Sequence, residues 1–387
     1  MAKKKTTAEA EPPAASPLLP LSGIIGNARP RRLLAAAVAE GRLLPALLLH
    51  GPRGIGKFTT ARSLAAAINC SEADGAEACL NCPSCRQIGN WAHPDVKVLE
   101  SDAESRAAGR PEFFPESPAV ARPGGRASAR LLVGQVRRLL RETAFKPFAG
   151  GRRVMIIRHL ESDPSMGCAN ALLKALEEPP AGTSFILTSS RPDRLPDTIR
   201  SRCQSLSFLP PSRQETAAFL QQQGVSPEEA TLRAALAGGR PGVALALDAQ
   251  GGLAQRDGIL AALTAAAGGE AVEAMAAADQ LLPAAADMPA LLDFFALVAR
   301  DLMVLHWDRD HRLIHNADRI PQLEEIGRHI HEQRAALLLE RIGWCQQALE
   351  RYVNPGMMLQ TLLLEAGGHL PAEPLTAPWL GNEEMEA

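Results

Sequence analysis

The chain has 387 residues, 46% of them hydrophobic, and a formal net charge of −2 at pH 7. This length predicts two or three domains with sizeable cores, and the near-neutral charge excludes a general attraction to nucleic acid or membranes. No apolar run reaches membrane-spanning length. The segment 1–20 lacks the apolar core of a signal peptide, so we expect a disordered tail and a cytoplasmic protein with no membrane partner.

A strand, a glycine loop and a helix are predicted between residues 46 and 68. The loop residues with phosphate-binding spacing G-x-x-x-x-G-K are Gly51, Gly54, Gly56 and Lys57. In such loops, backbone N–H groups and the lysine bind phosphates, and a hydroxyl after the lysine binds magnesium. Phe58 stands at that position, and Thr59 points elsewhere on a helix. We therefore expect that ATP or ADP can bind without hydrolysis; an ordinary glycine turn is the alternative.

Four of the seven cysteines lie close together in the sequence: Cys70, Cys79, Cys82 and Cys85. Overlapping C-x-x-C steps and a fourth cysteine nine residues upstream allow four thiolates to surround one Zn²⁺ ion. With no secretion signal, a metal is favoured over disulfides, and a complete ligand set predicts a structural role. We expect a zinc module at about 70–94. Free buried thiols are the alternative, and His93 is a further possible ligand.

Further strands are predicted at 95–99, 153–157, 184–188 and 205–208 from their apolar character. Strands that alternate with helices predict a mostly parallel sheet covered on both faces. A segment rich in proline and glycine at about 101–130 is predicted to be a mobile inserted loop, followed by a helix from about Ala129.

The strand at 153–157 ends in Arg158 and His159, and Glu161 lies three residues beyond it. A phosphate-loop ATPase has acidic residues at this strand end, which hold magnesium and orient the attacking water. This is the second feature that argues against ATP hydrolysis. Asp163 is predicted to cap the next helix, with Pro164 in its first turn.

After residue 210 the strand patterns end and amphipathic helices continue to about Gly367. We expect a small helical domain at 210–250, an all-α domain at 253–370 and a loose tail at 371–387. His311 and His315 lie one helical turn apart and are possible metal ligands, although no thiol or carboxylate pattern accompanies them.

Across residues 21–367 these motifs resemble the clamp-loader branch of the AAA+ ATPases. The segments that carry the resemblance are Ile24-Ile25-Gly26-Asn27, the glycine loop, the cysteine knuckle with His93-Pro94-Asp95, Asn170-Ala171-Leu172-Leu173-Lys174, Leu176-Glu177-Glu178-Pro179-Pro180 and Ser201-Arg202-Cys203. The resemblance implies a P-loop AAA+ domain at 21–209, with a parallel sheet between helices and an inserted zinc knuckle. A helical lid domain would follow at 210–250, and an all-α collar domain for oligomerisation at 253–370.

The resemblance also implies a role in the bacterial DNA polymerase III clamp loader, a pentameric ring of motor subunits and a delta subunit that places the sliding clamp on primed DNA. Arg202 would be an arginine finger acting on ATP bound by a neighbouring subunit; from the residues alone it is a surface arginine. Motor subunits of this family carry a hydroxyl at the Phe58 position, acids at Arg158 and His159, and an arginine at Gly242. This chain lacks all three, although Arg240 lies nearby, so we expect a non-catalytic subunit.

Two alternatives come from other classes of function. One is an active ATPase motor of the same family, against which Phe58 and Arg158 argue. The other is a zinc-dependent nucleic-acid-binding protein with a degenerate nucleotide fold, but only 4% of the residues are aromatic and no basic run contains interleaved aromatics. The arginines at 137, 138, 141, 152 and 153 either form a solvated face or meet DNA phosphates in the ring.

Overall fold

The computed structural model describes residues 18–42, 45–110, 128, 130–149, 151–163, 165–249, 251–283, 288–305, 307, 311–348 and 354–371. The chain divides into two compact units, Met1–Glu215 with Arg240–Gly242, and Thr216–Gly239 with Val243–Ala387. The expected tails fall outside the described residues, apart from 18–20 and 371, and so does most of the expected insertion at 101–130.

The first unit is built on a five-stranded parallel sheet in the order β2-β3-β4-β1-β5. Its strands are β1 (Ala46–His50), β2 (Val96–Leu99), β3 (Arg153–Arg158), β4 (Thr183–Ser189) and β5 (Gln204–Ser207). The predicted strands and the parallel sheet are confirmed, with ends that differ by one or two residues at most. Because all strands are parallel, their carboxyl ends meet at one edge of the sheet.

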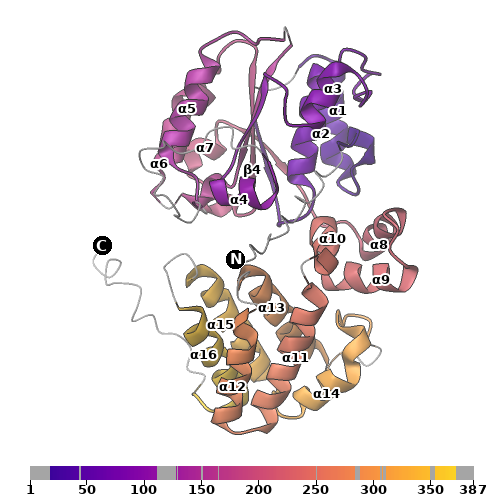
Figure 1. Cartoon of the computed structure of the whole chain (residues 1–387), viewed down its shortest axis with the longest axis vertical. Coiled ribbons are helices and arrows are strands. Elements are labelled where there is room, and N and C mark those ends of the chain that lie inside the picture. Colours follow the sequence, from indigo (N-terminus) through magenta and orange to yellow (C-terminus); the bar gives the residue numbers. More distant parts are fainter. Residues whose placement is uncertain are drawn as a thin grey trace, which may run out of the picture. The chain divides into compact units, whose positions relative to one another are not determined.

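Helices cover both faces of this sheet, as Figure 1 shows. They are η1 (Leu21–Gly23), α1 (Ala28–Ala39), α2 (Lys57–Asn69), α3 (Pro83–Gly89), α4 (Asp102–Ala107), α5 (Val133–Thr143), η2 (Leu160–Ser162), α6 (Gly167–Glu177), η3 (Pro192–Arg194) and α7 (Asp197–Arg200). Successive residues of β1 lie on opposite faces of the sheet and belong to separate cores. Leu47 and Leu49 pack with α1 and α2, whereas Ala46 and Leu48 pack with α5 and α6. This alternation is the period of two that a strand imposes.

Several local predictions are corrected. The expected loop at 101–130 begins with a helix, α4, because Ser101 caps it by accepting a hydrogen bond from Glu104 N. The helix after the insertion starts at Val133 rather than Ala129. Helix α6 starts at Gly167, and the Asp163 carboxylate reaches Cys168 N at 2.7 Å, so Asp163 serves the first turn from outside the helix.

In the second unit, the described elements are all helical, which confirms the predicted helical C-terminal part. The elements from residue 213 onward are α8 (Arg213–Gln222), α9 (Pro227–Leu236), α10 (Pro241–Ala249), α11 (Gly252–Gly268), α12 (Ala271–Leu281), α13 (Met288–Leu305), η5 (Ala317–Arg319), α14 (Ile320–Gly327), α15 (Glu332–Ala348) and α16 (Pro355–Gly367). One apolar core runs from Ala217 to Ala366. The separate lid and collar therefore stay a prediction. None of the described helices is long and apolar enough to cross a membrane.

Gly51 lies so close to the backbone of Phe208 that there is no room for a side chain. Its φ is +140°, and a Cβ atom there would lie 2.2 Å from the carbonyl oxygen of Phe208. We expect Gly51→Ala to lower the free energy of unfolding of this unit by about 3 kcal/mol, since both backbone strain and a backbone clash arise.

Urea unfolding measures this loss, and Gly134→Ala is the control. Gly134 is exposed in α5 and a Cβ there would meet nothing within 4 Å. Alanine should stabilise that helix by about 0.5–1 kcal/mol. Equal stability of the Gly51→Ala variant and the parent protein would contradict the close approach to Phe208.

Candidate nucleotide site and metal centre

The glycine loop lies between β1 and α2, at the carboxyl edge of the sheet, as the sequence predicts. Gly51, Gly54 and Gly56 have φ values of +140°, +76° and +92°, a region that side-chain-bearing residues rarely adopt. Gly56 is the N-cap of α2, and Lys57 is the first residue of that helix. The loop thus has the glycines and the helix N-terminus that phosphate binding uses.

Lys57 is turned back onto its own loop. Its Nζ donates hydrogen bonds to the carbonyl oxygens of Gly51 and Pro52, each at 2.6 Å. Burial lowers the pKa of Lys57 to about 8; the charge of Glu161 opposes this shift, and the charges of Arg158 and Arg53 add to it. The ammonium group is therefore held by loop carbonyls in surroundings that disfavour its charge.

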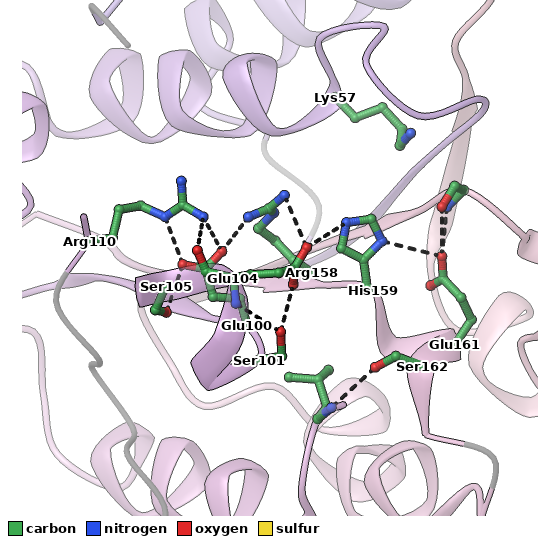
Figure 2. A network of polar contacts seen from close by, with 12 residues as sticks. Lys57, Glu100, Ser101, Glu104, Ser105, Arg110, Arg158, His159, Glu161 and Ser162 are labelled. Atoms are coloured by element: carbon green, nitrogen blue, oxygen red, sulfur yellow. Dashed lines mark hydrogen bonds and ion pairs between the residues drawn. The ribbon is translucent and has the colours of Figure 1, made fainter. Parts of the chain in front are cut away.

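Figure 2 shows a network of charged side chains next to this loop, at the ends of β2 and β3. Glu100, the residue after β2, accepts a hydrogen bond from Arg110 Nε at 2.7 Å and forms an ion pair with Arg158. Ser105 Oγ donates to the same carboxylate at 2.9 Å. Burial alone would raise the pKa of Glu100, but the Arg110 hydrogen bond and the charges of Arg158 and Arg110 outweigh it and hold the pKa below its ordinary value.

Phe58 belongs to a stack of rings and guanidinium groups beside the network. Its ring lies parallel to that of Trp91, with centroids 5.9 Å apart, and Arg158 lies over it at 4.4 Å. Arg62 covers Trp91 at 4.1 Å. Magnesium requires oxygen ligands and is repelled by a cation, so Phe58 and Arg158 supply the opposite of what metal binding needs.

Glu161, the acidic residue three positions after β3, is hydrogen-bonded to the segment that follows β4. Its Oε1 accepts hydrogen bonds from Ser190 N at 2.8 Å and Ser190 Oγ at 3.2 Å, and lies 3.6 Å from His159 Nδ1 (Figure 2). Burial alone would raise the pKa of Glu161, but the contact with His159 and the N–H of Ser190 lower it. Glu161 thus joins the ends of β3 and β4.

Gly242 also meets the glycine loop. Its N–H donates to Gly54 O at 2.8 Å, and a Cβ atom at Gly242 would lie 3.0 Å from that oxygen. Any side chain here would crowd the loop. This close approach accounts for a glycine at position 242.

The four predicted cysteines are brought together around α3. Their sulfur atoms all lie within 4.8 Å of one another, and Cys70 Sγ lies 3.8 Å from Cys82 Sγ. Sulfurs bound tetrahedrally at about 2.3 Å from a zinc ion would be about 3.8 Å apart. Backbone N–H groups of Cys79 and Cys82 point at the sulfurs of Cys70 and Cys79, at 3.3 and 3.2 Å. The cluster therefore has the geometry to hold a metal ion.

The three histidines considered as possible metal ligands are not part of this cluster. Among the described residues, no group of three or more potential metal ligands includes His93, His311 or His315. The Nδ1 of His93 accepts a hydrogen bond from Asp95 N at 3.1 Å, and His315 Nδ1 lies 3.1 Å from the buried carboxylate of Asp301. These contacts give His93 and His315 structural roles.

Arg202 lies between α7 and β5 and is partly exposed. Its Nε donates to Glu177 Oε1 at 2.7 Å, Nη2 contacts the same oxygen, and Nη1 donates to Thr198 O at 2.9 Å. The following residue, Cys203, is buried and anchors the segment against the core. The guanidinium is therefore at the surface of the first unit, before β5, whereas the glycine loop and its charged network follow β1, β2 and β3 at the carboxyl edge of the sheet.

Sequence reasoning missed Glu100, Arg110 and Trp91. They come from three separate segments, and only the three-dimensional sheet brings them to Phe58 and Arg158. One signal was available for Glu100: like Arg158, it follows a predicted strand, and parallel strands end at a common edge.

Comparison with known proteins agrees with this arrangement. The family model described as DNA polymerase III, delta subunit, matches residues 26–212. DNA polymerase III subunit delta' of Pseudomonas aeruginosa is 30% identical over 325 residues, which cover 83% of this chain and 89% of that protein. The chain belongs to the DNA polymerase III delta' family.

Other members and relatives of the delta' family fit this assignment. Subunit delta' of Escherichia coli is 26% identical over 355 residues, or 90% of this chain and 96% of that protein. Subunit tau of Bacillus subtilis is 33% identical over 185 residues, which are 48% of this chain but 28% of tau. Membership in the delta' family makes the chain a clamp-loader subunit of DNA polymerase III with a P-loop AAA+ fold.

The Glu100 network generates a pH-dependent stability prediction. Glu100→Gln removes the buried carboxylate that pairs with both Arg110 and Arg158, so we expect a loss of about 3 kcal/mol in the free energy of unfolding at pH 7. A lowered carboxyl pKa stabilises the folded state above the unfolded pKa, about 4.3, and this stabilisation is lost as the pH falls through the folded value. The difference between the two proteins should therefore shrink below about pH 4.

Glu104→Gln is the control in these unfolding experiments. Glu104 is more exposed than Glu100 and lies 3.6 Å from Arg158, so its loss should cost under about 1 kcal/mol. A Glu100→Gln variant as stable as the parent at pH 7 would show that the network does not carry this stability.

Proposed function

We propose that this chain is a non-catalytic subunit that completes the clamp-loader ring and supplies Arg202 as an arginine finger to a neighbouring ATPase subunit. The observation that carries the proposal is a contrast within one unit. Next to its own glycine loop, Phe58 and Arg158 provide an aromatic ring and a cation in place of magnesium ligands, whereas Arg202 stands at the surface with two N–H groups that no contact among the described residues uses. An arginine finger acts on the nucleotide bound by a neighbouring subunit. In the transition state, negative charge spreads over the phosphoryl oxygens, and the guanidinium of the neighbour's arginine stabilises it.

The partners in this proposal are clamp-loader motor subunits and a delta subunit in a pentameric ring, which loads the sliding clamp onto primed DNA in the cytoplasm. The similarity of 185 residues of this chain to subunit tau supports a ring of related subunits. The residual loop, with Lys57, leaves nucleotide binding possible, and the missing hydroxyl and acids argue against turnover.

We also propose that the metal held by Cys70, Cys79, Cys82 and Cys85 is Zn²⁺ in a structural role. Four thiolates at tetrahedral spacing suit zinc, and a complete set of protein ligands leaves no position for substrate. The ion would tie the end of α2 to α3, in a module that otherwise has a small core.

The metal content of the purified protein tests the zinc assignment. Elemental analysis of the protein, purified with its thiols reduced, should give one zinc per chain. Cys82→Ser should lower the zinc content and loosen the module, because the metal-free thiols provide little folding energy. Cys345→Ser is the control, because Cys345 is a buried cysteine outside the cluster; this variant should retain one zinc per chain. Protein without zinc would contradict the assignment.

The isolated chain should show no ATP turnover above background. Phe58→Thr restores a hydroxyl but leaves Arg158 at the strand end, so this variant should also be inactive. A colorimetric phosphate assay checks both proteins. Steady turnover that disappears in Lys57→Ala would overturn the non-catalytic role.

Arg202→Ala tests the finger in the reconstituted clamp loader. We expect the variant to fold and assemble normally, since a partly exposed ion pair contributes little stability. Fingers are worth about 10³–10⁵ in rate at one site, but several sites turn over, so the loss in total ATP turnover should be smaller. Clamp loading on primed DNA should fall further than ATP turnover.

Arg202→Lys separates the finger from a simple positive charge. A lysine cannot reproduce the planar fork, so clamp loading should be nearly as impaired as with alanine. Arg200→Ala is the control, because Arg200 is a nearby surface arginine paired with Asp197. Normal clamp loading by an Arg202→Ala complex of verified composition would leave Arg202 with a structural role only.

A further inference from the structure

Glu177 is the residue that fixes the direction of the Arg202 guanidinium. A guanidinium has five N–H donors, and three are used here, by Nε and Nη2 toward Glu177 Oε1 and by Nη1 toward Thr198 O. The contacts given by the described residues leave two N–H groups, on Nη1 and Nη2, for another molecule. Glu177 therefore binds one edge of the planar group and leaves donors on the other side.

The position of Glu177 is unfavourable for its own helix. It is the last residue of α6, where the partial negative charge of the helix end disfavours a carboxylate. Leu176 before it is buried, and Pro179 and Pro180 stop the helix just beyond, so the backbone at Glu177 is firmly placed. An acid at this point is explained by its pairing with Arg202.

Arg202 is held from the other side by a second helix end. Thr198 lies in the short helix α7, whose neighbouring residue Ile199 is fully buried. Its carbonyl oxygen accepts from Nη1, a contact that a helix C-terminus favours for a cation. Two anchored segments thus converge on one flexible side chain.

We propose that Glu177 is a positioning residue for Arg202, and that it presents the free guanidinium edge to the phosphoryl oxygens of the nucleotide on the neighbouring subunit. This inference rests on the proposed finger function. An arginine side chain has large rotamer freedom, which must be given up when it reaches a transition state. A carboxylate that has already ordered the guanidinium removes part of this cost from the reaction.

Glu177→Gln in the reconstituted complex is the central test, because glutamine keeps the size and one oxygen acceptor but removes the charge. We expect the rate of clamp loading on primed DNA to fall about two- to fivefold, the factor that corresponds to an exposed ion pair. The ATP concentration for half-maximal rate should stay unchanged, since the finger acts in the transition state. The melting temperature and the composition of the complex should also stay unchanged. If Glu177 had only a structural role, a slower rate would come with a lower melting temperature or an incomplete complex.

Glu178→Gln is the matched control. Glu178 is the next residue, is exposed, and has no hydrogen-bond partner for its carboxylate among the contacts given for the described residues. Clamp loading should be normal in this variant. A faster rate in Glu177→Gln would overturn the proposal, because it would show that the ion pair restrains the finger instead of presenting it.

A double-mutant cycle separates this inference from the function on which it rests. In an Arg202→Ala background, Glu177→Gln should have no further effect, since Glu177 acts through Arg202. If Arg202→Ala alone has no effect on clamp loading, the proposed finger function fails. If Arg202→Ala slows loading and Glu177→Gln does not, the finger stands and the positioning role of Glu177 is wrong.

Discussion

The ion pair between Glu100 and Arg158 is the contact on which the character of the glycine-loop site depends. Arg158 and Arg110 both approach the ring of Phe58, and without a negative charge between them two guanidinium groups would share a poorly solvated place. Glu100 makes this arrangement possible, and so allows an arginine to stand at a strand end where phosphate-loop ATPases hold an acid. A cation and an aromatic ring then occupy the position that a metal ion and its hydroxyl ligand would need.

The same sheet keeps the unused site and the proposed finger physically separate. The glycine loop and the Glu100 network follow β1, β2 and β3, whereas Arg202 precedes β5 and is held by the ends of α6 and α7. Substitutions at Phe58 or Arg158 therefore need not disturb Glu177 or Arg202. The proposed function requires this separation, because Arg202 is proposed to act on another subunit's nucleotide independently of the glycine loop in its own chain.

How far the sequence predicted the structure depends on the range of the interactions involved. The glycine loop, the cysteine cluster and the parallel strands follow from short spacings and apolar runs, and the structure has all of them. The ends of helices were harder to predict from the sequence. Asp163 binds the backbone of Cys168 from outside α6, so the helix starts later than a cap at Asp163 would suggest. Trp91, Arg110 and Glu100 could not be assigned, because their function lies in contacts between segments distant in the chain. The roles of Arg202 and Lys57 depend on partners that one chain does not contain.

The stack of Phe58 on Trp91 has a consequence for how this subunit can change over evolution. Trp91 follows α3 in the cysteine module, and Phe58 is the second residue of α2 after the glycine loop, so the ring contact joins the two parts. A return to a hydroxyl at residue 58 would remove a surface that Trp91, Arg110 and Arg158 all use, before any acid was available to bind magnesium. Any single substitution toward a magnesium site therefore passes through a less well packed protein.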